Sequence, residues 1–438
     1  MRKQISDLLG KEENKKIFSN FVSLFFLQGV SLLLPLITFP YLVRVLGIEK
    51  YGLVFFAQAF IAYFSTLTEY GFNLTGTREI SLHKNDSNKL IKIYNSILGA
   101  RLMLVSLGFV IMSIVVLSFE KFSIDWKLYF LTYGVVVGTA LFPTWFFQGM
   151  EKMKFITILT VISKTIFTVL IFVLVKSSED YLWVPSLYSI GNIFVGIISL
   201  IIINKQFDIP FRLQKANSVF QQLKNGWYVF ISNVSINLYS ATTTFVLGLV
   251  TNASMVGYYA IAVKMIKIIA TLFAPLNQSV YPHIVQLTKK SPKEAASFVR
   301  KIMKYTIIIS IGILLIGIFF TRPLFYLVFG HDVEHSILLF RLLSPLIIIL
   351  PIASILFNIA LLSFKMDTHF FKIYRTGAIL NVILLGLLLF VVKLSTIGAG
   401  ISLLICETTL TVYAGILLYK SGIYVFPFFM KNKIINHQ

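Results

Sequence analysis

The sequence predicts an all-α membrane protein of about twelve transmembrane helices. Hydrophobic residues make up 57% of the chain and charged residues 13%, whereas soluble domains carry roughly 25% charged residues. The mean hydropathy is +0.83. Apolar segments of about 20 residues, the length that spans the hydrocarbon core, recur along the whole chain. They lie at residues 17–39, 51–70, 91–117, 127–148, 155–176, 182–203, 225–249, 256–280, 304–321, 337–362, 373–392 and 396–419.

The positions of lysine and arginine predict how these spans are oriented. Most of the 39 Lys and Arg residues fall on the side of the membrane that carries the N-terminus, and cytoplasmic loops carry such an excess. Because the number of spans is even, both termini are expected in the cytoplasm. The first apolar run, 17–39, is too long for a signal-peptide core and lacks a small-residue cleavage pattern, so we expect an uncleaved helix.

A short internal similarity indicates two halves in the same orientation. The tripeptide Val-Leu-Gly at 45–47 recurs at 246–248, although a match of this length also arises by chance. Parallel repeats of this kind occur in transporters with a site between the halves. We therefore expect an N-terminal lobe at 1–203, a polar cytoplasmic linker at 204–224 that lies as an interfacial helix, and a C-terminal lobe at 225–438.

Signatures of the common enzyme and metal-site classes are absent from the sequence. It has no HExxH, no GxxxxGK and no GxSxG motif, and its single cysteine, Cys406, excludes a disulfide within the chain. The net charge of +21 is dispersed between apolar stretches, so no nucleic-acid partner is expected. His331, Asp332, Glu334 and His335 occupy a loop and are expected to be solvated. We predict no catalytic residue, no metal and no cofactor.

Ionisable residues inside the apolar segments are the strongest functional signal, because a charge near the bilayer centre costs on the order of 3 kcal/mol. Five of them are cations, and one acidic residue, Glu407, cannot neutralise them all. Some cations are therefore predicted to line a hydrated cavity that favours anionic cargo, although each side chain could instead reach the membrane interface. Glu407 is expected to be an ion-pair partner, a proton carrier or both. The cations are Lys164, Lys264, Lys267, Arg101 and Arg341.

Two of the predicted spans carry polar stripes. Asn233 and Asn237 lie four residues apart in 225–249, and Gln28 begins a similar stripe in 17–39. This spacing places the side chains on one helical face. Their amides could hydrogen-bond sugar hydroxyls, or they could hold neighbouring helices together as such residues do in membranes. Both interpretations stay open.

Three stretches near the N-terminus carry a family resemblance. Residues 39–58 (FPYLVRVLGIEKYGLVFFAQ), 69–74 (EYGFNL) and 77–80 (TREI) resemble the Wzx-type polysaccharide flippases of the multidrug/oligosaccharidyl-lipid/polysaccharide exporter superfamily. The resemblance implies two six-helix lobes around a central cavity. It also implies transfer of undecaprenyl-diphosphate-linked O-antigen or capsule repeat units across the bacterial inner membrane. Arg44 would then contact the diphosphate, and Arg78 would form a cytoplasmic gate, unless the two arginines mark topology alone.

The family resemblance and the buried cations also indicate the expected partners and the competing functions. Lipid-linked oligosaccharide and membrane lipid are the expected partners, together with a polysaccharide polymerase and a chain-length regulator. A cation-coupled multidrug exporter of the same superfamily would favour buried carboxylates over buried lysines. A membrane enzyme, such as a polymerase or acyltransferase of surface polysaccharide, would need a larger hydrophilic loop than the longest external one, at 321–336.

Overall fold

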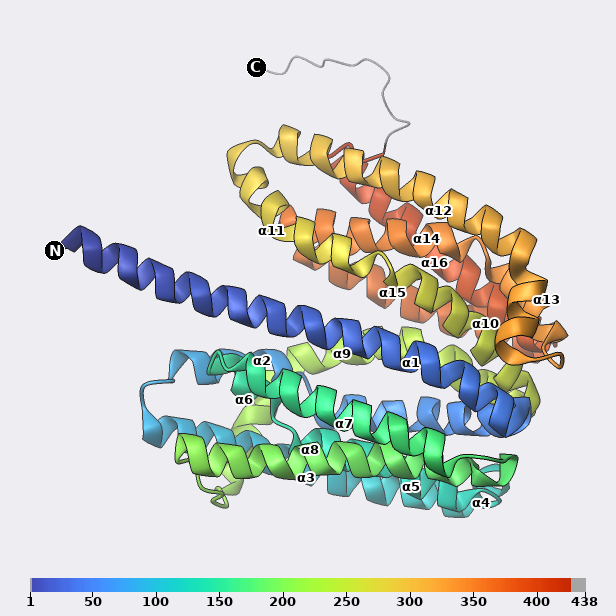
Figure 1. The fold of residues 1–438 in the computed structure, drawn as a ribbon, viewed down its shortest axis with the longest axis horizontal. Coiled ribbons are helices and arrows are strands. Elements are labelled where there is room, and N and C mark those ends of the chain that lie inside the picture. Colours follow the sequence, from blue (N-terminus) through green and yellow to red (C-terminus); the bar gives the residue numbers. More distant parts are fainter. Residues whose placement is uncertain (1, 427–438) are drawn as a thin grey trace. The chain divides into compact units, whose positions relative to one another are not determined.

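The computed structural model describes residues 2–426, which fold into helices joined by turns and contain no β-strand (Figure 1). The predicted all-α class is confirmed for this part of the chain. Contacts divide the chain into two compact units, Met1–Asn237 (unit 1) and Leu238–Gln438 (unit 2). Side chains are described throughout 2–426 except at residues 2–28, 30–33, 232, 235–240, 275, 278, 279, 282, 367, 368 and 371.

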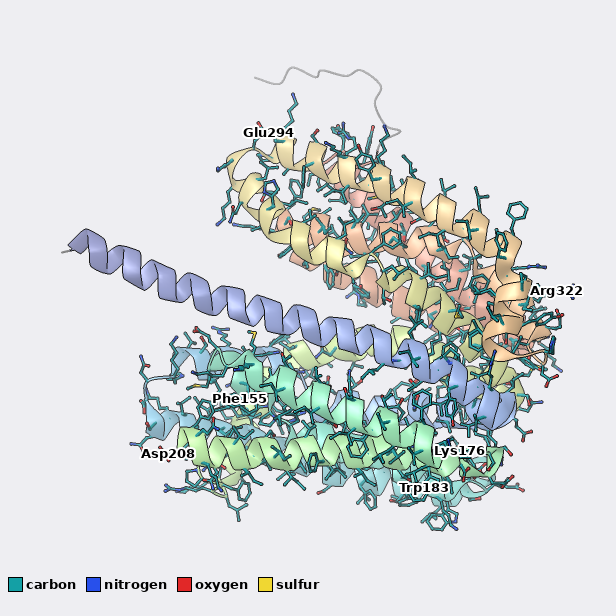
Figure 2. All side chains as sticks on the ribbon, viewed as in Figure 1. Phe155, Lys176, Trp183, Asp208, Glu294 and Arg322 are labelled. Carbon is teal, nitrogen blue, oxygen red and sulfur yellow. The ribbon has the colours of Figure 1, made fainter. Side chains whose placement is uncertain are left out.

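Unit 1 contains the helices of the first half of the chain. They are α1 (Arg2–Glu69), α2 (Phe72–Leu82), α3 (Ser87–Ser118), α4 (Glu120–Ser123), α5 (Trp126–Leu141), α6 (Thr144–Gly149), α7 (Met153–Leu174), the 3-10 turn η1 (Ser178–Leu182), α8 (Trp183–Phe207) and the first part of α9 (Ala216–Val250). Helices α7 and α8 are antiparallel: Phe155 and Asp208 lie at one end of the unit, and Lys176 and Trp183 at the other (Figure 2).

Unit 2 contains the rest of α9 and the helices that follow it. They are α10 (Ala253–Thr271), α11 (Ala274–Lys290), α12 (Pro292–Phe329), α13 (Glu334–Leu343), α14 (Leu346–Ser354), the π-helix η2 (Ile355–Leu361), α15 (Asp367–Leu385), the π-helix η3 (Gly386–Val391) and α16 (Ser395–Lys420). Within this unit, α12, α14 and α16 run side by side (Figure 1).

The described helices include nine that are long and apolar enough to cross a membrane, or up to 10 if the bent pair α13 and α14–η2 is one span. This confirms a multi-pass membrane protein. The stretch Leu34–Leu82 is counted once but joins parts of two predicted spans, and the apolar part of α9 among the described residues, Ala241–Val250, is short. The figure of twelve spans therefore stays a prediction.

Two predicted spans contain a break in the structure. Span 127–148 agrees with one candidate membrane span, Trp126–Gly149, but α5 ends before Pro143 and α6 follows it. Span 256–280 is wrong in its extent, because α10 ends at Thr271 and α11 begins with a proline in its first turn. Proline lacks the N–H that a continuous helix needs. Spans 17–39 and 51–70 lie in two helices that share the label α1 and are separated by a kink at Gly47, where φ is 73°. That backbone region favours glycine.

The predicted linker at 204–224 lies against α3 in unit 1. The amide of Asn95 donates to the backbone oxygen of Pro210 at 3.0 Å and accepts from the backbone N–H of Arg212 at 2.9 Å. Helix α9 starts at Ala216 and runs unbroken past residue 225. The division into 1–203, 204–224 and 225–438 stays a prediction.

Side-chain caps begin three of the helices that position the site. Asp86 accepts the backbone N–H of Lys89 at 3.1 Å and caps α3. This hydrogen bond lowers the pKa of the Asp86 carboxyl below its usual value. Asn252 caps α10 through the N–H of Met255, and Ser291 caps α12. Each cap satisfies a backbone donor that the first helical turn leaves without a partner.

Small residues let α5 and α8 approach closely in unit 1. A Cβ built on Gly138 would lie 2.4 Å from the backbone carbon of Asn192, so a larger residue requires one helix to move. Close approach of backbones through glycine is a common way for membrane helices to pack. The register of α8 against α5 therefore depends on Gly138.

We expect Gly138→Ala to lower the free energy of unfolding by about 1–3 kcal/mol, because the new methyl group overpacks the α5–α8 contact. Gly312→Ala is the matched control. Gly312 also lies inside a helix, α12, but a Cβ there meets no atom within 4 Å, so we expect no loss of stability. Unfolding in detergent would measure both; equal losses in the two variants would contradict the packing account.

Candidate functional site

Helix α7 places Lys164 at the wall of a cavity inside unit 1. Its neighbour Ser163 is buried and donates a hydrogen bond to the backbone oxygen of Gly191 in α8, at 3.1 Å. This contact holds α7 against α8 and leaves the Lys164 side chain exposed. The cavity has a volume of about 210 Å³. Its polar lining residues are Thr38, Thr160, Ser163, Lys164, Thr168, Tyr188 and Asn192.

Helix α10 carries Lys264 and Lys267 in unit 2. Lys264 is half-buried and Lys267 is exposed. Glu407 of α16 interacts electrostatically with Lys267. Its roles as an ion-pair partner and as a proton carrier both stay predictions.

Next to Glu407 along α16 lies a buried polar cluster that has no counterpart among the predicted site residues. The amide nitrogen of Asn381 in α15 donates to the hydroxyl of Thr243 in α9 at 3.2 Å, and the hydroxyl of Ser402 in α16 donates to the Asn381 amide oxygen at 3.0 Å. All three side chains are buried. A signal for it is present in the sequence, since Asn381 is the one amide residue in the apolar run 373–392.

We expect Asn381→Leu to lower the free energy of unfolding by about 1–2 kcal/mol, because the hydroxyls of Thr243 and Ser402 lose their shared partner in an apolar interior. Asn358→Leu is the control, because Asn358 is exposed and its amide bonds Ser354 within the same chain segment. Reversible unfolding in bicelles would measure both. A loss for the control as large as that for Asn381→Leu would show that the cluster does not stabilise unit 2.

Arg101 lies in the interior of unit 1 and is 3% exposed. Its guanidinium donates to the backbone oxygens of Thr139, at 2.7 Å, and Phe142, at 3.3 Å. These oxygens belong to the end of α5, where the helix supplies no partner of its own. Glu69 at the end of α1 interacts electrostatically with Arg101. Arg101 thus connects α3 to the end of α5, and its contact with a substrate stays a prediction.

The other three predicted arginines lie on three separate helices. Arg44 is in α1, Arg78 in α2 and Arg341 in α13, and all three side chains are exposed. None of them lines the cavity at Lys164. Their roles as substrate contacts and as a gate stay predictions.

The predicted polar stripes are described in part. Asn233 is half-buried in α9 within unit 1. Gln28 in α1 and Asn237 in α9 lie on described helices, but their side chains are outside the described residues. Whether these amides bind sugar or hold helices together stays open.

Of the four residues expected in a solvated loop, Glu334 and His335 lie instead at the start of α13 and take part in local contacts. Arg322 of α12 (Figure 2) forms an ion pair with Glu334 at 2.8 Å, and the Tyr326 hydroxyl also donates to Glu334. A ring nitrogen of His335 lies 3.0 Å from the Thr396 hydroxyl. In the part of the chain that the structure describes, no group of three or more His, Cys, Asp or Glu residues is placed to hold a metal ion.

Comparison with solved structures shows a shared fold. "Lipid II flippase MurJ, inward closed conformation" superposes with a TM-score of 0.69 and 13% identity, covering 93% of this chain and 88% of that chain. An inward-facing multidrug resistance MATE family transporter of the MOP superfamily gives 0.62 and 13%, covering 89% and 94%. At these identities the likeness concerns the fold.

Sequence comparison shows the family. Two relatives are each named "Putative O-antigen transporter" and are 28% identical to this chain. The Escherichia coli (strain K12) protein aligns over 392 residues, 90% of this chain and 94% of its own length, and the Shigella dysenteriae protein over 371 residues, 83% and 91%. The model of the family described as "Polysaccharide biosynthesis protein" matches residues 17–288. Since that match covers more than half of the chain, the protein belongs to the polysaccharide biosynthesis protein family.

Proposed function

We propose that this protein is a flippase that moves undecaprenyl-diphosphate-linked O-antigen or capsule repeat units from the cytoplasmic to the periplasmic face of the bacterial inner membrane. The observation that carries the proposal is Lys164, a cation in the middle of an apolar helix that lines a cavity with hydroxyl and amide neighbours. The names of the relatives, which describe O-antigen transport, support the same cargo.

The proposed cargo needs a polar route because its headgroup is charged. Moving a diphosphate and several sugars through bare hydrocarbon would cost on the order of tens of kcal/mol in the idealised limit. A cation in a hydrated cavity lowers that cost, since it attracts the diphosphate where water is scarce. Lys164 would supply this charge in unit 1, and Lys264 and Lys267 would supply it in unit 2, while the lipid tail stays in the bilayer.

We further propose that transport proceeds by alternating access with both termini in the cytoplasm, as the distribution of lysine and arginine predicts. Arg101, Arg341 and Arg44 are proposed as further contacts of the headgroup, and Arg78 as a residue of the cytoplasmic gate. The amides of Gln28, Asn233 and Asn237 would bond sugar hydroxyls.

Glu407 is the proposed coupling residue. Glu407 interacts electrostatically with Lys267, a proposed cargo contact, so gain of a proton by Glu407 would change the net charge near the cargo site by one unit. A polymerase and a chain-length regulator are the proposed partners that consume the product on the other face.

A transport assay tests the proposal directly. The full chain, reconstituted in liposomes that contain lipid-linked oligosaccharide labelled on its sugar, is expected to move the label between leaflets, as reported by its accessibility to an added lectin. In cells, loss of the protein should leave single lipid-linked units on the cytoplasmic face. Accumulation of single units on the periplasmic face would instead indicate a polymerase. Export of organic cations without movement of the lipid would indicate a drug exporter.

A further inference from the structure

A second cavity lies in unit 2 at the C-terminal end of α16. Its volume is about 490 Å³, which falls in the range of sites that hold organic ligands. One wall is a face of α16, and the other is the segment that follows the helix. The lining is aliphatic and aromatic apart from two tyrosine hydroxyls. The lining residues are Val412, Gly415, Ile416, Tyr419, Ile423, Tyr424, Val425 and Phe426.

Two glycines allow the chain to fold back and form this cavity. Gly422 has a φ of 75°, a conformation that glycine adopts at the ends of helices, and the N–H of Ile423 donates to the oxygen of Leu418 at 2.9 Å. A Cβ on Gly415 would lie 2.6 Å from the ring of Phe426, so glycine admits that ring against α16. Val425 is buried in the core of unit 2. Both walls are therefore held in place.

Positive charge adjoins the cavity on the α12 side. The guanidinium of Arg300 donates to the backbone oxygen of Tyr424 at 2.6 and 3.0 Å. Lys304 is exposed one helical turn further along α12, and Lys420, also exposed, is the last residue of α16. The stretches 295–304 and 412–426 contain no acidic residue. Arg300 therefore borders the apolar hollow, and Lys304 and Lys420 follow close by in the chain, one turn beyond Arg300 and next to Tyr419, with no acidic residue on these two stretches.

We propose that this cavity binds an anionic phospholipid, with one acyl chain in the apolar hollow and the phosphate beside Lys304 and Lys420. An apolar chain joined to a negative headgroup matches the apolar lining and the basic rim together. Tyr419 and Tyr424 line the hollow close to Lys420 and Arg300, and tyrosine is enriched at the level of lipid headgroups. Basic pockets between membrane helices bind such headgroups. The predicted orientation of the chain would place this site in the cytoplasmic leaflet, and the site is independent of the transported cargo.

The test measures lipid binding to the purified full chain by native mass spectrometry, with phosphatidylglycerol as the probe and phosphatidylcholine as the neutral reference. The double variant Lys304→Gln, Lys420→Gln is expected to bind phosphatidylglycerol about thirty-fold more weakly, since each cation near a lipid surface contributes a factor of about five. Val412→Trp, which fills the hollow, should weaken binding to a similar extent. The double variant Lys289→Gln, Lys290→Gln, which changes two exposed lysines on α11, is the charge-matched control and should bind normally.

Arg300 is left unchanged in these variants because it holds the backbone of Tyr424, and a thermal unfolding scan checks that each variant is folded. Unchanged phosphatidylglycerol binding in the folded double variant would overturn the proposal. So would displacement of phosphatidylglycerol by undecaprenyl phosphate at a lower concentration, which would assign the site to the cargo lipid. A tenfold gain in binding on removal of residues 427–438 would assign the cavity to the chain's own terminus.

Discussion

Replacing Lys164, Lys264 and Lys267 together with alanine is expected to lower surface polysaccharide at least a hundredfold. Each lysine would attract a diphosphate in a region of low dielectric, where two unit charges 4 Å apart interact by about 4 kcal/mol at an effective dielectric of 20. After the cost of removing water from both charges, we expect about tenfold per lysine, equivalent to about 1.4 kcal/mol. Polymer on cells that carry only the variant measures the effect, with protein abundance in the membrane checked in parallel.

Two controls separate the effect of positive charge at these three positions from the effect of the total charge of the protein. Arginine at the same three positions keeps the charge and should retain most of the polymer. Alanine at Lys127, Lys176 and Lys393, which are exposed lysines near the ends of their helices, removes the same net charge and should leave export unchanged. Normal polymer in the Lys164, Lys264, Lys267 triple variant would refute the cationic route.

Arg101→Leu is expected to destabilise unit 1 by about 2–4 kcal/mol, because backbone oxygens in the interior would be left without their charged donor. Two such oxygens at the end of α5 accept from Arg101, and Glu69 would also lose its electrostatic attraction to Arg101. Low abundance in the membrane and a lower unfolding temperature in detergent would report the loss. Because Arg101 connects α3 to the end of α5 in the interior of unit 1, we expect the packing of unit 1 to be affected.

Arg341→Leu is the matched control, because Arg341 is exposed on α13 and its loss should change stability by less than about 0.5 kcal/mol. Arg101→Lys keeps one charge but cannot reach two oxygens with a planar fork, so an intermediate stability is expected. If Arg101→Leu is stable yet fails to export polymer, Arg101 contacts the cargo and its structural role is refuted.

The helices were predictable from the sequence, and their interruptions were less so. The apolar runs of about 20 residues reflect the thickness of the bilayer, which is a local requirement on each segment. Pro143 lay inside a predicted span but ends α5 with a break, whereas Pro351 lies inside α14 without one. Whether a proline breaks a membrane helix depends on which neighbouring groups satisfy the backbone that it frees, and those neighbours are distant in sequence.

For the candidate site residues too, the residue type was predictable from the sequence, whereas the surroundings of each side chain depended on distant parts of the chain. Lys164 was predictable as a cation at bilayer depth, but its cavity depends on the contact between Ser163 and Gly191 in another helix. Arg101 is also a cation inside an apolar segment, but its guanidinium donates a hydrogen bond to a backbone oxygen at the end of α5. The sequence does not identify Asn381 as part of a polar cluster, because a single amide in an apolar run can occur without a specific partner. Its partners, Thr243 and Ser402, lie in other helices.

By itself, the sequence determined the membrane class, the helical segments, the family and the excess of cations within apolar helices, because hydropathy and charge are properties of each segment taken alone. Tertiary structure decided which of those cations meets a cavity and which one caps a helix. It also decided where α16 folds back to enclose a second cavity. These outcomes depend on close approach between helices far apart in the chain, which glycine, proline and buried hydrogen bonds permit only once the helices have packed.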